Sequence, residues 1–206
     1  MSSPTPDHAR LITAIVDTLV PADDNGPGGS EAGVDAYISG VVRDNEAMRG
    51  IYEPSLDALD AYATSSAGAK FADLDLEGRT KVLKAIEAGE AEGGFIPDPA
   101  TFFAILHHNM LEGFFGDPQY GGNVDFAGWK LVGYRGVKLI QTAADQAVNA
   151  APDRPLTGRR EALEVALAEL AKESGEAVAA KSASAKIPVT SSSSASARPP
   201  ASPSVR

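Results

Sequence analysis

The residues best suited to chemistry are two adjacent histidines, His107 and His108, and an acid that follows them, Glu112. His108 and Glu112 are four positions apart, so on a helix their side chains share one face. Such a pair could bind a metal ion or transfer protons as a histidine–carboxylate dyad. On a helix His107 points about 100° away from His108, so the two histidines cannot chelate one ion. The same residues also fit polar contacts on a helix surface, and the general scarcity of catalytic sites favours that interpretation.

The sequence lacks the motifs of other common chemistries. It contains no G-x-S-x-G turn for a serine nucleophile and neither of the glycine patterns that bind nucleotide phosphates. It has no cysteine, which excludes disulfides, thiolate metal sites and cysteine nucleophiles. A stand-alone, metal-assisted enzyme would therefore have to use His107, His108 and Glu112, with Asp117 beside them.

The segment that carries the histidines runs into an aromatic loop. Residues 102–136 hold five of the seven phenylalanines and the only tryptophan. Glycine, proline, asparagine and aspartate recur through residues 116–129, which predicts tight turns. Aromatic side chains on such turns fit either a surface that meets a partner or a loop that folds back on its own core. The residues that would contact a partner are Phe114, Phe115, Asp117, Pro118, Tyr120, Asn123, Phe126, Trp129 and Tyr134.

Helical periodicity covers most of the chain on both sides of this loop. Asp75 and Asp98 are expected N-caps, and Pro54 fits the first turn of a helix. No strand pattern of period two is found, so the sequence predicts an all-α fold. We expect an irregular bundle of about six helices with a long Gly/Pro/aromatic loop. The helical patterns cover residues 7–20, 31–49, 53–66, 74–91, 100–115, 137–150 and 158–173.

The end of the chain has a different composition. Residues 181–206 contain nine serines and four prolines, with no aromatic residue and no acid. Such a segment cannot bury enough apolar surface to offset the entropy lost on ordering. We therefore expect one helical domain over residues 1–176 and a disordered Ser/Ala/Pro-rich tail over residues 177–206.

The charge of the chain limits its partners. The net charge is −10, but residues 1–180 carry 14 basic and 28 acidic side chains, a net of −14. This balance argues against nucleic acid, which requires clustered lysine and arginine. No stretch reaches the roughly 20 apolar residues that span a bilayer, and no secretory or twin-arginine signal precedes the first helix. The sequence thus predicts a cytoplasmic protein without direct membrane insertion.

Two long stretches resemble a known family. The run EGFFGDPQYGGNVDFAGWKLVGYRG (residues 112–136) is similar to the signature of the gluconate 2-dehydrogenase subunit 3 family, the small subunits of flavin-dependent sugar and polyol dehydrogenases. The earlier run TLVPADDNGPGGSEAGVDAYI (residues 18–38) resembles the family's other recurring stretch, in the right order and spacing. The resemblance covers about residues 8–150.

The resemblance implies a helical, non-catalytic subunit that binds a large flavoprotein of the glucose-methanol-choline type. FAD and the oxidation of the sugar's CH–OH group would belong to that partner, and this chain would bind no cofactor. A cytochrome or another acceptor would take the electrons through the complex. The loop over residues 113–136 would then be the docking surface, and the histidines would be polar parts of the helix beneath it.

The chain departs from the family pattern in three places. It has no twin-arginine signal, it has Arg135 where the pattern has proline, and it adds the Ser/Ala/Pro tail. We therefore expect a cytoplasmic complex that oxidises a sugar or glycoside. The alternatives are a metal-assisted enzyme that works alone and a scaffold unrelated to oxidoreductases.

Overall fold

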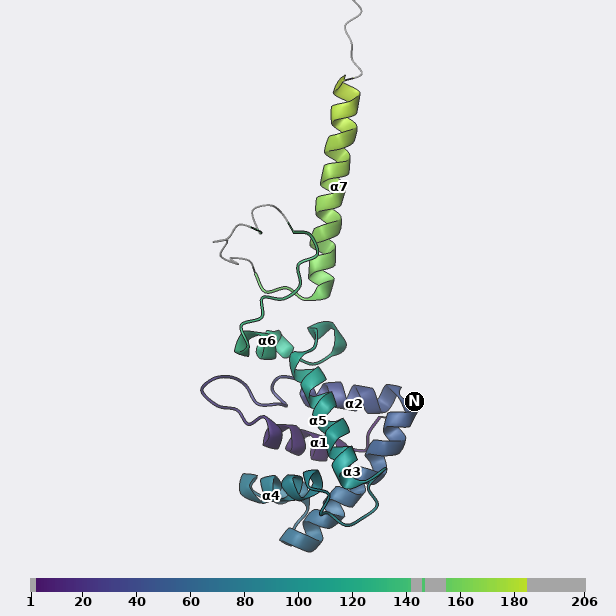
Figure 1. Cartoon of the computed structure of the whole chain (residues 1–206), viewed down its shortest axis with the longest axis vertical. Coiled ribbons are helices and arrows are strands. Elements are labelled where there is room, and N and C mark those ends of the chain that lie inside the picture. Colours follow the sequence, from purple (N-terminus) through teal and green to yellow (C-terminus); the bar gives the residue numbers. More distant parts are fainter. Residues whose placement is uncertain (1–2, 142–145, 147–154, 185–206) are drawn as a thin grey trace, which may run out of the picture. The chain divides into compact units, whose positions relative to one another are not determined.

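The computed structural model describes residues 3–141, 146 and 155–184, with side chains to residue 175. The fold is all-α, as predicted: this part of the chain forms seven α-helices and three short 3₁₀ turns (Figure 1). Residues 1–164 form one compact unit and residues 165–206 a second. The description below concerns the first unit unless stated otherwise.

Three helices begin the fold, namely α1 (Pro6–Leu19), α2 (Val34–Asp44) and α3 (Glu46–Ala67). The predicted boundary between the second and third helices was wrong. The chain breaks at Asn45, whose side-chain oxygen accepts the N–H groups of Ala47 and Met48 and so caps α3. Pro54 consequently lies inside α3 rather than in its first turn. Neither glycine nor proline marks this break, so apolar periodicity alone could not place it.

The next two helices begin where their capping aspartates predicted. Asp75 accepts the Gly78 N–H at 2.8 Å at the start of α4 (Leu76–Glu87). Asp98 accepts the Thr101 N–H at 2.9 Å at the start of α5 (Pro99–Phe115). Between α3 and α4 lies the short turn η1 (Phe71–Asp73), which buries Phe71. Both N-caps are therefore confirmed, and an aspartate before a helical pattern predicted where each helix begins.

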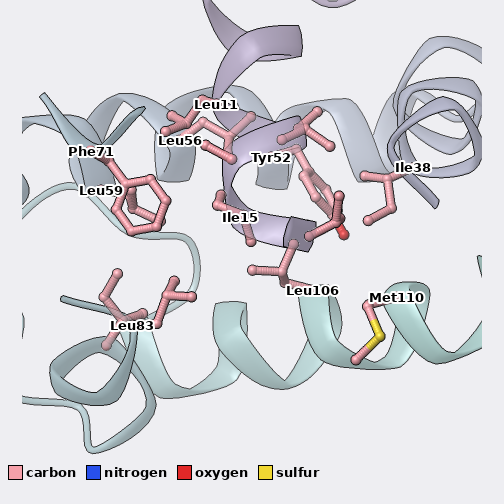
Figure 2. Close-up of a cluster of buried hydrophobic side chains, with 14 of the residues drawn as sticks. Leu11, Ile15, Ile38, Tyr52, Leu56, Leu59, Phe71, Leu83, Leu106 and Met110 are labelled. Carbon is pink, nitrogen blue, oxygen red and sulfur yellow. The ribbon is translucent and has the colours of Figure 1, made fainter. Parts of the chain in front are cut away.

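The core lies between α1 and the helices around it. Figure 2 shows Leu11 and Ile15 of α1 pointing toward Tyr52 and Leu56 of α3 and Leu106 of α5. Within this apolar surrounding, Asn109 donates a hydrogen bond from Nδ2 to the Tyr52 hydroxyl at 2.8 Å. Burial raises the pKa of Tyr52, so the hydroxyl stays neutral and the pair satisfies both polar groups inside the core.

The chain after α5 is mostly irregular. It forms the turns η2 (Pro118–Tyr120) and η3 (Val124–Phe126) and the short helix α6 (Ala127–Leu131). The helix predicted over residues 137–150 is wrong for residues 137–141, which are not helical, and most of the rest lies outside the described residues. Gly136 has a left-handed backbone, and the Val137 N–H donates a hydrogen bond to the Thr157 carbonyl. These two features keep the start of this segment out of a helical conformation.

The last helix, α7 (Arg159–Ser184), is longer than the predicted 158–173. Residues 177–184, predicted to be part of the tail, belong to this helix. The remainder of the predicted tail, residues 185–206, lies outside the described residues. No helix in the described part of the chain is long and apolar enough to cross a membrane.

Two leucines of α5 test how the core contributes to stability. Leu106 is fully buried, whereas Leu111 on the same helix is 39% exposed. We expect Leu106→Ala to lower the free energy of unfolding by about 2–5 kcal/mol, because it removes buried methyl groups and leaves a cavity. Leu111→Ala should cost less than about 1 kcal/mol. Urea denaturation followed by circular dichroism measures both, and equal losses would contradict this assignment of the core.

Candidate functional site

The two predicted histidines lie on the outside of α5 and point apart. The His107 ring stacks on Phe103, with ring centroids 6.1 Å apart. His108 Nε2 lies 3.2 Å from a carboxylate oxygen of Glu112, and both side chains are largely exposed. The second Glu112 oxygen accepts the Tyr37 hydroxyl at 3.1 Å, which links α5 to α2. Burial, and then this bond to Glu112, raise the pKa of Tyr37, so it remains a donor.

These contacts are those of a helix surface rather than of a metal centre. No group of three His, Cys, Asp or Glu side chains in the described residues is placed to hold a metal ion. His108, Glu112 and Tyr37 instead form a polar link beside the aromatic loop. The candidate site is therefore the loop itself, which we call the motif loop (residues 113–136).

Asn123 organises the motif loop from within. Its side chain is fully buried. Its Nδ2 donates to the Gly116 carbonyl at 2.8 Å, and its Oδ1 accepts the Gly128 N–H at 2.9 Å. Its backbone is left-handed, with φ of 50°, a conformation that asparagine adopts more readily than most residues. One side chain thus joins the end of α5 to the start of α6.

The loop holds unusual backbone conformations close to Asn123. Asp125 and Phe126 are also left-handed, with φ of 53° and 59°. Such residues cost of the order of 1 kcal/mol or more each, and they persist only where the surroundings fix them. Here the Phe126 N–H donates to the Asn123 carbonyl and the Val124 N–H donates to the Ala32 carbonyl, each at 2.9 Å. The strained turn directs Val124 and Asp125 outward, where both are exposed.

The Trp129 side chain points to the inside of the motif loop rather than to its outer surface. It is only 5% exposed, and its Nε1 donates to the Phe115 carbonyl at 2.7 Å. Its indole stacks with Phe126 and meets Tyr134 edge-on, at centroid distances of 5.3 and 4.8 Å. The tryptophan therefore supports the aromatic side chains that flank it.

Close backbone approach explains two of the glycines. A Cβ atom at Gly122 would overlap the Gly113 carbonyl, and one at Gly128 would overlap the Phe114 carbonyl. Both carbonyls belong to the last turn of α5. Only glycine lets the loop lie this close to the end of the helix.

Asp117 has a structural partner. One of its carboxylate oxygens accepts the Gln119 N–H at 3.1 Å, and the other accepts the Arg159 N–H at 2.6 Å. It therefore caps η2 and also the first turn of α7, where a negative charge is favourable. The second role could not be predicted from local sequence, because Arg159 is 42 positions away.

The nine predicted contact residues divide between the inside and the outside of the loop. Phe114, Asn123 and Trp129 are buried, so they shape the loop and cannot form its outer surface in this conformation. Asp117, Pro118 and Phe126 are half-buried. Phe115, Tyr120 and Tyr134 are exposed, Tyr120 most of all at 62%. Three aliphatic residues that the prediction omitted are equally exposed: Val124, Leu131 and Val132. Their position in the same run of glycines and aromatics was the signal that could have identified them.

The loop lies beside the other stretch singled out in the sequence. Residues 20–33, between α1 and α2, run next to η3 and α6 (Figure 1). Asp17 accepts both the backbone N–H and the hydroxyl of Ser30, at 2.8 and 2.9 Å, which orders this connection. The two motifs, far apart in sequence, therefore build one surface.

A comparison with known families assigns the chain to one of them. The sequence profile described as Gluconate 2-dehydrogenase subunit 3 matches residues 6–136. The chain belongs to the gluconate 2-dehydrogenase subunit 3 family. No curated protein and no solved structure matches the chain. The family match contains α1 to α6 and ends at Gly136, so α7 lies beyond the part that defines a gluconate 2-dehydrogenase subunit 3.

The single tryptophan provides a direct test of how Asn123 holds the loop. Asn123→Gly keeps a left-handed backbone accessible but removes both side-chain hydrogen bonds. We expect the Trp129 emission to shift to longer wavelength and acrylamide quenching to increase, because the indole becomes more exposed. Leu76→Ala, on an exposed residue of α4, should leave both readings unchanged. An unaltered emission spectrum in Asn123→Gly would show that the side chain does not hold the loop.

Proposed function

We propose that this chain is a non-catalytic small subunit that binds and stabilises a flavin-dependent oxidoreductase of the glucose-methanol-choline type. The partner would carry FAD and oxidise a CH–OH group of a sugar or glycoside. The family itself is named for a dehydrogenase subunit, which supports a hetero-oligomeric assembly. The observation that carries the proposal is a motif loop whose backbone is fixed from inside while several large apolar side chains face outward.

The exposed side chains have the chemistry of a protein interface. Tyr120, Val132 and Tyr134 are between 46% and 62% exposed, and Phe115 is 38% exposed. Aromatic residues contribute large contact areas and retain polar edges, which is why they are frequent at interface hot spots. A soluble protein that exposes several such groups together in one segment usually covers them with a partner.

The rigidity of the loop supports the same role. Asn123 and Trp129 hold the backbone through hydrogen bonds to the Gly116 and Phe115 carbonyls. A loop already fixed in this way loses little conformational entropy on binding, so more of the contact energy appears as affinity.

The effect on the flavoprotein follows from mass action. A subunit that binds only the folded partner shifts its folding equilibrium toward the native state. The electrons from the flavin would pass to a cytochrome or another acceptor elsewhere in the complex, which we place in the cytoplasm. His107, His108 and Glu112 would contribute polar contacts near the interface and no chemistry of their own.

Co-expression with the flavin oxidoreductase encoded nearest to this chain tests the proposal. The flavoprotein should co-purify with the tagged small subunit and bring FAD with it, and its melting temperature should rise in the complex. The small subunit alone should show no sugar oxidation with an artificial electron acceptor. Turnover by the isolated chain would instead support a stand-alone enzyme, and failure to capture the flavoprotein would count against the subunit role.

Tyr120 is the most informative residue for the docking surface. Because it is exposed, Tyr120→Ala should leave the folded chain intact while weakening the complex by about tenfold, the scale of an interface hot spot. Trp129→Ala is a less specific change, since it also removes a buried ring and a hydrogen bond within the loop. Titration of the purified flavoprotein gives the affinity, with circular dichroism as the check on folding. An unchanged affinity for Tyr120→Ala would remove this residue from the interface.

A further inference from the structure

A shallow groove of about 450 Å³ lies between the motif loop and the connection between α1 and α2, residues 20–33. One wall comes from the connection between α1 and α2, at Asn25, Pro27 and Glu31. The other comes from η3 and α6, mainly at Val124, Asp125 and Leu131. The Val124 N–H bond to the Ala32 carbonyl holds the two walls together. The groove is therefore a fixed feature of the fold.

The groove presents apolar side chains. Val124 is 46% exposed and Leu131 is 50% exposed, although both lie in a segment whose backbone is firmly held. Val124 directly precedes the left-handed turn at Asp125 and Phe126, and Leu131 ends α6, the helix that follows this turn. Their exposure thus follows from the path of the backbone. The two side chains form an apolar contact site for a side chain of another molecule.

The charge around the groove is predominantly negative. Two acids, Asp125 and Glu31, line it together with one basic residue, Lys130. Two further acids, Asp23 and Asp24, belong to the same connection as Glu31. Hydrogen bonds from the Asn25 side chain and backbone lower the pKa of Asp23, so this carboxylate stays ionised. The Asp125 carboxylate forms no hydrogen bond or ion pair with another described residue, in contrast to the Asp117 carboxylate. An unpaired acid beside an apolar contact site is complementary to lysine or arginine, whose positive charge lies at the end of an aliphatic side chain.

We propose that this groove receives a segment of the flavoprotein that carries an arginine or lysine next to a large apolar side chain. The apolar side chain would lie between Val124 and Leu131, and the cation would pair with Asp125. This inference rests on the proposed function, because it takes the occupant from the flavoprotein. It adds a second contact region, on the side of the motif loop that faces the α1–α2 connection.

Single cysteines test whether the partner covers the groove. The chain has no cysteine, so Leu131→Cys introduces a unique thiol. Leu76→Cys on α4 is the matched control, since Leu76 is 52% exposed and lies outside the groove. In the complex with the flavoprotein encoded nearest to this chain, we expect maleimide labelling of Leu131→Cys to slow by about tenfold or more. Labelling of Leu76→Cys should keep its rate.

Charge variants test the chemistry of the occupant. Asp125→Asn removes the charge but keeps a residue that tolerates the left-handed backbone. Its affinity for the flavoprotein should fall by about three- to tenfold, and the salt dependence of binding should weaken. Glu90→Gln, at an exposed acid outside the groove, should bind as the unmodified chain does. Lys130→Gln should bind equally or more tightly, because the expected occupant is basic.

The outcomes separate this inference from the proposed function. If the unmodified chain captures the flavoprotein while Leu131→Cys stays fully reactive, the groove proposal is wrong and the subunit role stands. If Asp125→Asn strengthens binding and Lys130→Gln weakens it, the occupant is acidic and the proposal is overturned. If the free chain at high concentration protects Leu131→Cys, a second copy occupies the groove instead. If no flavoprotein is captured at all, the proposed function itself fails.

Discussion

The conformation of the motif loop depends on the backbone carbonyls left unpaired at the C-terminal end of α5. The last four carbonyls of any α-helix have no partner within the helix, and a buried helix end must find donors for them elsewhere. At the end of α5, Trp129 donates to the Phe115 carbonyl and Asn123 donates to the Gly116 carbonyl that follows. Gly122 and Gly128 lie against the carbonyls of Gly113 and Phe114, where no side chain would fit. The loop is therefore a cap for α5, and its shape follows from that function.

This arrangement separates the residues that build the loop from those that the loop displays. Buried asparagine, tryptophan and glycine fix the backbone, and the tyrosines and aliphatic residues between them face outward. A rigid support with an apolar exterior suits a subunit that works through contact, because little entropy is lost when the partner binds. The α1–α2 connection, held through Asp17 and Ser30, extends the same surface. Helices α1 to α5 contribute the hydrophobic core.

The sequence predicted what local chemistry determines and missed what distant contacts determine. Asp75 and Asp98 were recognised as caps because the residues they bind are three positions away. The aromatic and glycine content marked the motif loop, but composition could not separate the buried Trp129 from the exposed Tyr120. That difference depends on which ring meets the end of α5. Likewise, the apolar pattern over residues 137–150 predicted a helix, but Val137 donates its N–H to Thr157, twenty positions away.

Two aspartates of the motif loop show why an acid in a docking motif must be judged by its partners. Asp117 accepts two backbone N–H groups and fixes the start of α7, so its carboxylate is already satisfied within the chain. Asp125, eight positions later, has a strained backbone that places its carboxylate outward beside an apolar groove. Removing the first carboxylate would leave the N–H groups of Gln119 and Arg159 without this acceptor, whereas removing the charge of the second changes only the surface. Of these two acids, Asp125 is therefore the one placed to recognise another molecule.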